Sequence, residues 1–149
     1  MDDEALMKEA LHEAQSAFAE GEVPIGAVVA KDGQILGRGH NSKENLCDPT
    51  AHAEILALRQ AGRFSRNWRL TGSALYVTAE PCLMCLGAAL QARVATIVFG
   101  CEEPKFGALR LLAQDDIVRA GNHKLIVQGG ILAQECAEVL RSFFETKRR

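Results

Sequence analysis

Short strand-like segments alternate with helical segments along the chain, and this order restricts the possible folds more than any other feature. The segments predicted as strands are residues 25–30, 34–38, 74–78, 96–99 and 125–127. The Asp32-Gly33 pair predicts a tight turn that joins the first two strands as a hairpin. Apolar residues at helical spacing predict a first helix that ends near Gly21, helices over residues 51–61, 81–91 and 108–119, and a final helix from Ile131 to Phe144. Because the later strands are connected through helices, we expect an α/β chain with three α/β/α layers and a mixed five-stranded sheet.

Length and composition favour one domain over residues 1–149. A chain of 149 residues with 48% hydrophobic residues can bury one core. No run approaches the roughly 18 apolar residues of a membrane span, and the start Met1–Glu4 is acidic where a secretory signal is basic, so we expect a cytoplasmic protein without a membrane partner. With a formal net charge of −2, a polyanion would have to bind a local basic patch. Lys147-Arg148-Arg149 is a candidate, although a solvated helix end explains it equally well.

Two segments that each begin a predicted helix contain the residues of a metal site. His52 follows Thr50, the predicted N-cap of one helix, and Cys82 and Cys85 follow Pro81 at the start of another. The i, i+3 spacing places both sulfur atoms on one helix face, where free N–H groups favour thiolates. Zinc prefers thiolate and imidazole ligands, and a catalytic zinc site leaves its fourth position to water. We therefore predict that His52, Cys82 and Cys85 bind one zinc ion.

Glu54 is the predicted catalytic residue of this site. It lies two residues after His52, close enough to reach a water molecule on the metal without being a ligand itself. A carboxylate in that place can take a proton from water and deliver it to a substrate, which is general acid–base catalysis beside a metal ion. The sequence therefore indicates a hydrolytic enzyme.

The same motifs allow other interpretations. A single Cys-x-x-Cys is also typical of a redox pair, and a single His-x-Glu carries little information. Together the two motifs leave structural zinc as the main alternative, for which Cys47 or Cys101 would supply a fourth ligand. The five cysteines form an odd set, which favours reduced thiols over a disulfide framework.

The motifs also resemble a known family. Zinc deaminases of nucleobases carry His-x-Glu followed by Pro-Cys-x-x-Cys, and both are present here. Along nearly its whole length the chain resembles the bacterial tRNA-specific adenosine deaminases. The matching stretches are Gly21–Ala27, Asp48–Glu54, Asn67–Leu70, Leu75–Cys85, Asn122-His123 and Phe143-Phe144.

The resemblance implies a cytidine-deaminase-like fold and a role for each site residue. His52, Cys82 and Cys85 would hold one zinc ion per subunit, and Glu54 would move protons. Asn41 would hydrogen-bond the purine ring, and the N–H of Ala53 would face the same base. The reaction would convert adenosine to inosine at the wobble position of a tRNA anticodon loop, with the base splayed into the pocket of a homodimer.

The sequence departs from the family pattern at positions whose neighbourhoods approach the RNA. Glu103 stands where the family usually has Asp, Ala79 where it usually has Leu, and the usual Gly-Ser pair is missing after residues 108–110. A deaminase of a free purine base, a nucleoside or a related aminated heterocycle is therefore the alternative. From another class, a zinc-stabilised binding module without turnover also remains, and it requires four protein ligands where an enzyme requires three.

Overall fold

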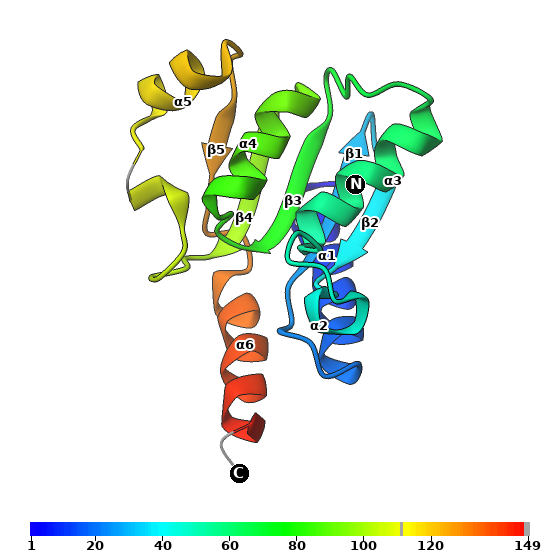
Figure 1. The fold of residues 1–149 in the computed structure, drawn as a ribbon, viewed down its shortest axis with the longest axis vertical. Helices are drawn as coiled ribbons and strands as arrows, with labels where there is room; N and C mark the ends of the chain where they lie inside the picture. Colours follow the sequence, from blue (N-terminus) through cyan, green and yellow to red (C-terminus); the bar gives the residue numbers. More distant parts are fainter. Residues whose placement is uncertain (111, 148–149) are drawn as a thin grey trace.

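The Asp32-Gly33 turn joins two antiparallel strands, β1 (Gly26–Lys31) and β2 (Gln34–His40), at one edge of a five-stranded sheet. Both turn residues have positive φ, 51° and 76°, as a tight hairpin turn requires. The computed structural model describes residues 1–110 and 112–147 (Figure 1). The predicted hairpin is confirmed.

The sheet is mixed, as predicted. Its strand order is β2-β1-β3-β4-β5, with β1 antiparallel to β2 and β3, and β3, β4 and β5 parallel to one another. The remaining strands are β3 (Ala74–Ala79), β4 (Thr96–Cys101) and β5 (Ile126–Gln128). The helices are α1 (Asp3–Ala19), α2 (Lys43–Leu46), α3 (Ala53–Ser65), α4 (Leu83–Ala92), the 3₁₀ turn η1 (Ala108–Arg110), α5 (Gln114–Gly121) and α6 (Ala133–Lys147).

Alternating side chains divide the strands between two hydrophobic layers. Val29 of β1 and Val77 of β3 pack with α3 and α4, whereas Val28 and Tyr76 pack on the other face with α1 and α6. Successive strand residues point to opposite faces, so each layer receives every second residue. Figure 1 shows α3 and α4 on one side of the sheet. The predicted α/β/α layering is therefore confirmed.

Helix α3 lies unusually close to strand β2. A Cβ built at Gly37 would meet the backbone of Ala57 and Ala61, and one at Gly39 would meet the backbone of Ala53 and Ala57. The missing side chains allow direct contact between the strand and the helix. This contact holds the start of α3, and with it His52 and Glu54, against the sheet.

Several predicted boundaries were wrong. Thr50 is not the N-cap of α3, because its N–H and hydroxyl both donate to Oδ1 of Asp48 (2.8 Å each), and His52 occupies the N-cap instead. The helix predicted over residues 108–119 is a 3₁₀ turn followed by α5, with residue 111 outside the described part. The short helix α2 was not predicted, and the final helix begins at Ala133.

No helix within residues 1–110 and 112–147 is long and apolar enough to cross a membrane. In the basic tail, Lys147 ends α6, and Arg148 and Arg149 lie outside the described residues.

Candidate active site

The starts of helices α3 and α4 bring three ligand atoms together. His52 is the N-cap of α3, Cys82 is the N-cap of α4, and Cys85 lies in the first turn of α4. Nδ1 of His52 is 3.6 Å from Sγ of Cys82 and 3.4 Å from Sγ of Cys85. The three ligand atoms lie within 4.8 Å of one another, close enough to bind a single metal ion. Two sulfurs and one imidazole nitrogen are donors that a soft or borderline divalent ion prefers.

The two thiols have opposite acid–base properties. The hydrogen bond with Cys85 lowers the pKa of Cys82 to about 3 against the opposing effect of burial, with His52 lowering it further. The hydrogen bond with Cys82, together with burial, raises the pKa of Cys85. Cys82 is therefore the more readily ionised of the two thiols, and a bound cation would favour the thiolate form of both because thiolates are the metal-binding form.

Glu54 lies beside these ligands on the first turn of α3 and is 4% exposed. Burial raises its pKa to about 6, and the nearby His52 acts in the opposite direction. A carboxyl group with a pKa near neutrality can both accept and return a proton under ordinary conditions. Glu54 therefore has the properties of a general acid–base group.

His52, Cys82 and Cys85 together are called the metal-binding group, and a cavity of about 420 Å³ opens onto it. Asn41, which follows β2, and Ala53, the first residue of α3, line it together with His52, Glu54 and Cys82. The remaining lining residues are Val23, Ile25, Lys43, Ala79, Glu80, Glu103, Phe106, Leu140 and Phe144. The structure thus brings all six predicted site residues to one region, because Cys85 adjoins Cys82 in the metal-binding group.

Asn41 is held in place by backbone groups. Its Nδ2 donates to the carbonyl of Val23 (3.3 Å), and its Oδ1 accepts from the N–H of Lys43 (3.4 Å). Ala53 presents its N–H at a helix start, where such groups have no partner within the helix. Both residues therefore offer polar groups along the wall of the cavity.

Glu80 is a buried carboxylate that the sequence reasoning missed. Its Oε1 accepts from the N–H of Glu103 (3.2 Å), and its Oε2 accepts from the N–H of Leu109 (3.1 Å). The N–H of Ala108 also donates to the carbonyl of Pro81 (3.1 Å). These bonds attach the segment 102–109, named here the wall segment, to the strand–helix junction that carries Cys82. The only local signal is a charged residue directly after a buried strand.

Glu22 anchors another part of the cavity lining and was also missed. This 2% exposed carboxylate accepts from the N–H groups of Glu44 (3.1 Å) and Asn45 (2.7 Å) in α2. Helix α2 begins with Lys43, which lines the cavity. Glu22 therefore positions one cavity wall.

Neither candidate fourth ligand joins the metal-binding group among the described residues. Cys47 is exposed at the end of α2, with its Sγ 3.7 Å from the carbonyl of Glu44. Cys101 is buried at the end of β4, and its thiol donates to the carbonyl of Thr78 (3.5 Å). In the described residues the metal-binding group has only three protein ligands, the number expected at a catalytic site.

Comparison with known proteins agrees with this geometry. The sequence model of the MafB19-like deaminases matches residues 1–148. A tRNA-specific adenosine deaminase of Haemophilus influenzae is 46% identical to this chain, over 98% of this chain and 85% of that protein. A solved structure from work on A-to-I editing by tRNA:A34 deaminases has a TM-score of 0.85 at 40% identity, covering 91% of this chain and 99% of that one. A guanine deaminase structure from Bacillus subtilis has a TM-score of 0.65 at 34% identity, covering 83% and 73%. The chain belongs to the family of tRNA-specific adenosine deaminases.

Proposed function

We propose that this protein deaminates adenosine to inosine at the wobble position of a tRNA anticodon. The observation that carries this proposal is a group of three metal ligands that faces a cavity containing a buried carboxylate, Glu54. The names of the 46% identical relative and of the 40% identical structure supply the substrate. A cytoplasmic location is part of this proposal, because the bacterial relative is named for its action on tRNA.

Zinc is the metal that the ligand set fits best. His52, Cys82 and Cys85 match the two-sulfur, one-nitrogen donor set of catalytic zinc sites. When bound, zinc activates water for attack at neutral pH, because the ion lowers the pKa of water beside it to about 7.

Glu54 moves the protons of the reaction. Water adds to C6 of adenine and ammonia leaves, so both protons of the water are transferred: one to the ring nitrogen as the C–O bond forms, and one from the resulting C6 hydroxyl to the amino group as the C–N bond breaks. Glu54 takes the first proton from water and delivers it to the ring nitrogen, and then takes the second from the C6 hydroxyl and delivers it to the leaving amino group. Its raised pKa, about 6, lets the same carboxyl group act as base and as acid.

Asn41 and Ala53 orient the base. The side-chain amide of Asn41 and the N–H of Ala53 lie along the cavity wall, where they can hydrogen-bond the polar edge of a purine. A bound purine can hydrogen-bond these two groups, whereas an apolar ring of the same shape would bury them without partners. Because unpaired buried polar groups are costly, the cavity favours a purine.

The proposal is tested with an anticodon stem-loop that carries adenosine at the wobble position. The zinc-loaded protein should convert that adenosine to inosine, detected by mass spectrometry of the digested RNA. A stem-loop with adenosine moved to another loop position serves as the control. Failure of the zinc-loaded protein to produce inosine from the first RNA would reject the function.

Deamination of a free purine base is the second candidate. The similarity to a guanine deaminase of Bacillus subtilis favours it. Two residues that depart from the family pattern, Ala79 and Glu103, line the cavity and so can alter the choice of substrate. A panel of adenine, guanine and their nucleosides separates the candidates, because a tRNA-specific enzyme should leave every member of the panel unchanged.

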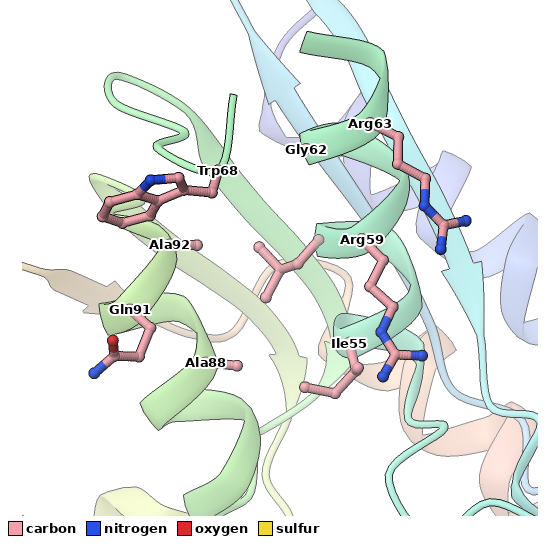
Figure 2. Close-up of a pocket in the computed structure, with 9 residues that line it drawn as sticks. Ile55, Arg59, Gly62, Arg63, Trp68, Ala88, Gln91 and Ala92 are labelled. Atoms are coloured by element: carbon pink, nitrogen blue, oxygen red, sulfur yellow. The ribbon is translucent and has the colours of Figure 1, made fainter. Parts of the chain in front are cut away.

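A homodimer is the proposed assembly, and a shallow groove between α3 and α4 is the surface that would form it. Ile55 and Leu58 of α3 and Ala88 and Ala92 of α4 line this groove of about 540 Å³. Figure 2 shows Trp68 beside the Ala92 end of α4 and Arg59 on the α3 side. A partly buried apolar groove with an arginine and an aromatic residue at its edges has the composition of protein interfaces.

A further inference from the structure

Phe106 presents an exposed aromatic ring at the rim of the cavity. Its side chain belongs to the wall segment and is 70% exposed, whereas Glu54, which lines the same cavity, is 4% exposed. Phe144 of α6, 45% exposed, is a second aromatic residue that lines this cavity. The cavity is thus lined both by buried polar groups and by aromatic side chains that are exposed to solvent.

The exposure of Phe106 follows from the way its backbone is anchored. The N–H groups of Glu103 and Leu109, on either side of it in sequence, both donate to the carboxylate of Glu80. Gly107 adds a close contact, because a Cβ at that position would overlap the same carboxylate. With the backbone held at these points, the wall segment presents the Phe106 ring to solvent.

The charged residues that line the cavity attract RNA only weakly. The lining residues include one cationic side chain, Lys43, besides His52, and three carboxylates, Glu54, Glu80 and Glu103. The formal net charge of the chain is −2. Since attraction of phosphates is weak here, stacking of bases on aromatic rings is the available source of affinity, and it operates on every base type.

We propose that Phe106 is a stacking platform for the nucleobase next to the edited adenosine in the RNA chain. The inference rests on the proposed function, because only a polynucleotide has a neighbouring base to stack. When the edited base enters the buried end of the cavity, the adjoining nucleotide must pass the rim. An unpaired base in a loop gains by covering an exposed aromatic face, as in other complexes of proteins with single-stranded RNA.

Kinetics of Phe106→Ala on the anticodon stem-loop test the proposal. Removal of one base–aromatic stack should raise KM for the stem-loop by about 5-fold to 150-fold. Phe106→Tyr and Phe106→Trp retain an aromatic face and should restore most of the affinity. Phe64→Ala is the matched control, because Phe64 is 60% exposed at the far end of α3 and does not line the cavity. Melting temperature and zinc content should stay at the wild-type values in all four variants.

Abasic substitution of the RNA identifies the stacked base. In the wild type, an abasic site on one side of the edited adenosine should raise KM, whereas in Phe106→Ala the same site should change little, because the two changes remove the same contact. Equal effects of the abasic sites in both proteins, or an unchanged KM in Phe106→Ala, would overturn the platform while leaving the proposed function intact. If the wild type itself produces no inosine from the stem-loop, the proposed function and the platform fall together.

Discussion

Gly107 lies so close to the carboxylate of Glu80 that a methyl group at position 107 would overlap it. The same carboxylate binds the wall segment through the N–H groups of Glu103 and Leu109. The absence of a side chain at Gly107 and the buried carboxylate of Glu80 therefore together position the wall segment at one side of the cavity.

Gly107→Ala should displace the wall segment. Overpacking at a tight site costs about 1–3 kcal/mol of unfolding free energy, and the displaced wall should also raise KM for the stem-loop. Urea denaturation and steady-state kinetics measure the two effects. Gly87→Ala is the control, because a Cβ there meets nothing within 4 Å and helix α4 favours alanine. Equal behaviour of the two variants would show that the Glu80 contact does not constrain the wall.

Glu54→Gln should separate metal binding from catalysis. The amide keeps the shape of the side chain and cannot accept the proton, so kcat should fall by about 100-fold to 10,000-fold. Zinc content, measured by atomic emission, should stay at the wild-type level because Glu54 is not one of the three ligands. A variant with undiminished kcat would show that Glu54 does not transfer the protons.

Cys85→Ser should reduce zinc binding and the stability that zinc confers. Loss of one of three protein ligands weakens the site, and a ligand that binds only the folded state stabilises it by mass action. Thermal melting with and without a chelator should show a shift in the wild type and almost none in Cys85→Ser. The control is Cys47→Ser, whose exposed thiol lies outside the metal-binding group and should leave the chelator shift unchanged.

Stability should depend on the protonation of His40. Nδ1 of its ring lies 3.0 Å from Oε1 of Glu13 and Nε2 lies 2.6 Å from Oε2 of Glu20. Only the imidazolium form donates from both nitrogens. Partial burial acts to lower the pKa of His40, but the hydrogen bonds to Glu13 and Glu20 outweigh it and raise the pKa above 6.5.

The sign of the pH effect follows from that raised pKa. The stabilising contribution is complete below pH 6.5 and is lost as the pH rises through the folded-state value. His40→Gln lacks a titrating ring, so the wild type should lose unfolding free energy relative to this variant between pH 6 and pH 9. Urea denaturation at both pH values measures it, and parallel curves for the two proteins would contradict the prediction.

Ala88→Glu should disrupt a dimer formed through the groove between α3 and α4. A carboxylate at the centre of an apolar interface would be buried without a partner, which is strongly unfavourable. Light scattering after gel filtration should show a dimer for the wild type and a monomer for the variant. Lys8→Glu on α1 changes charge on a different, exposed surface and should remain dimeric. A wild-type monomer would reject the assembly.

The metal-binding group and the layered mixed sheet could be predicted from sequence because their determinants are local. Ligand chemistry identifies His52, Cys82 and Cys85, and a proline or a strand end indicates where each helix begins. Runs of consecutive apolar residues, such as residues 25–30, indicate strands that are buried on both faces of the sheet. Glu54 was recognised through its spacing from His52, which is also a local property.

Only the tertiary structure decided which groups surround that site. Glu80 bonds to backbone groups 23 and 29 positions away, and Glu22 to groups 22 and 23 positions away, so no short window of sequence contains either interaction. The helix predicted from Ala108 failed for the same reason, since the N–H of Leu109 donates to Glu80 and the chain there forms a 3₁₀ turn. Side-chain chemistry and hydrophobic periodicity are local properties of the sequence, whereas a buried carboxylate acquires its partners only when distant backbone segments fold against it.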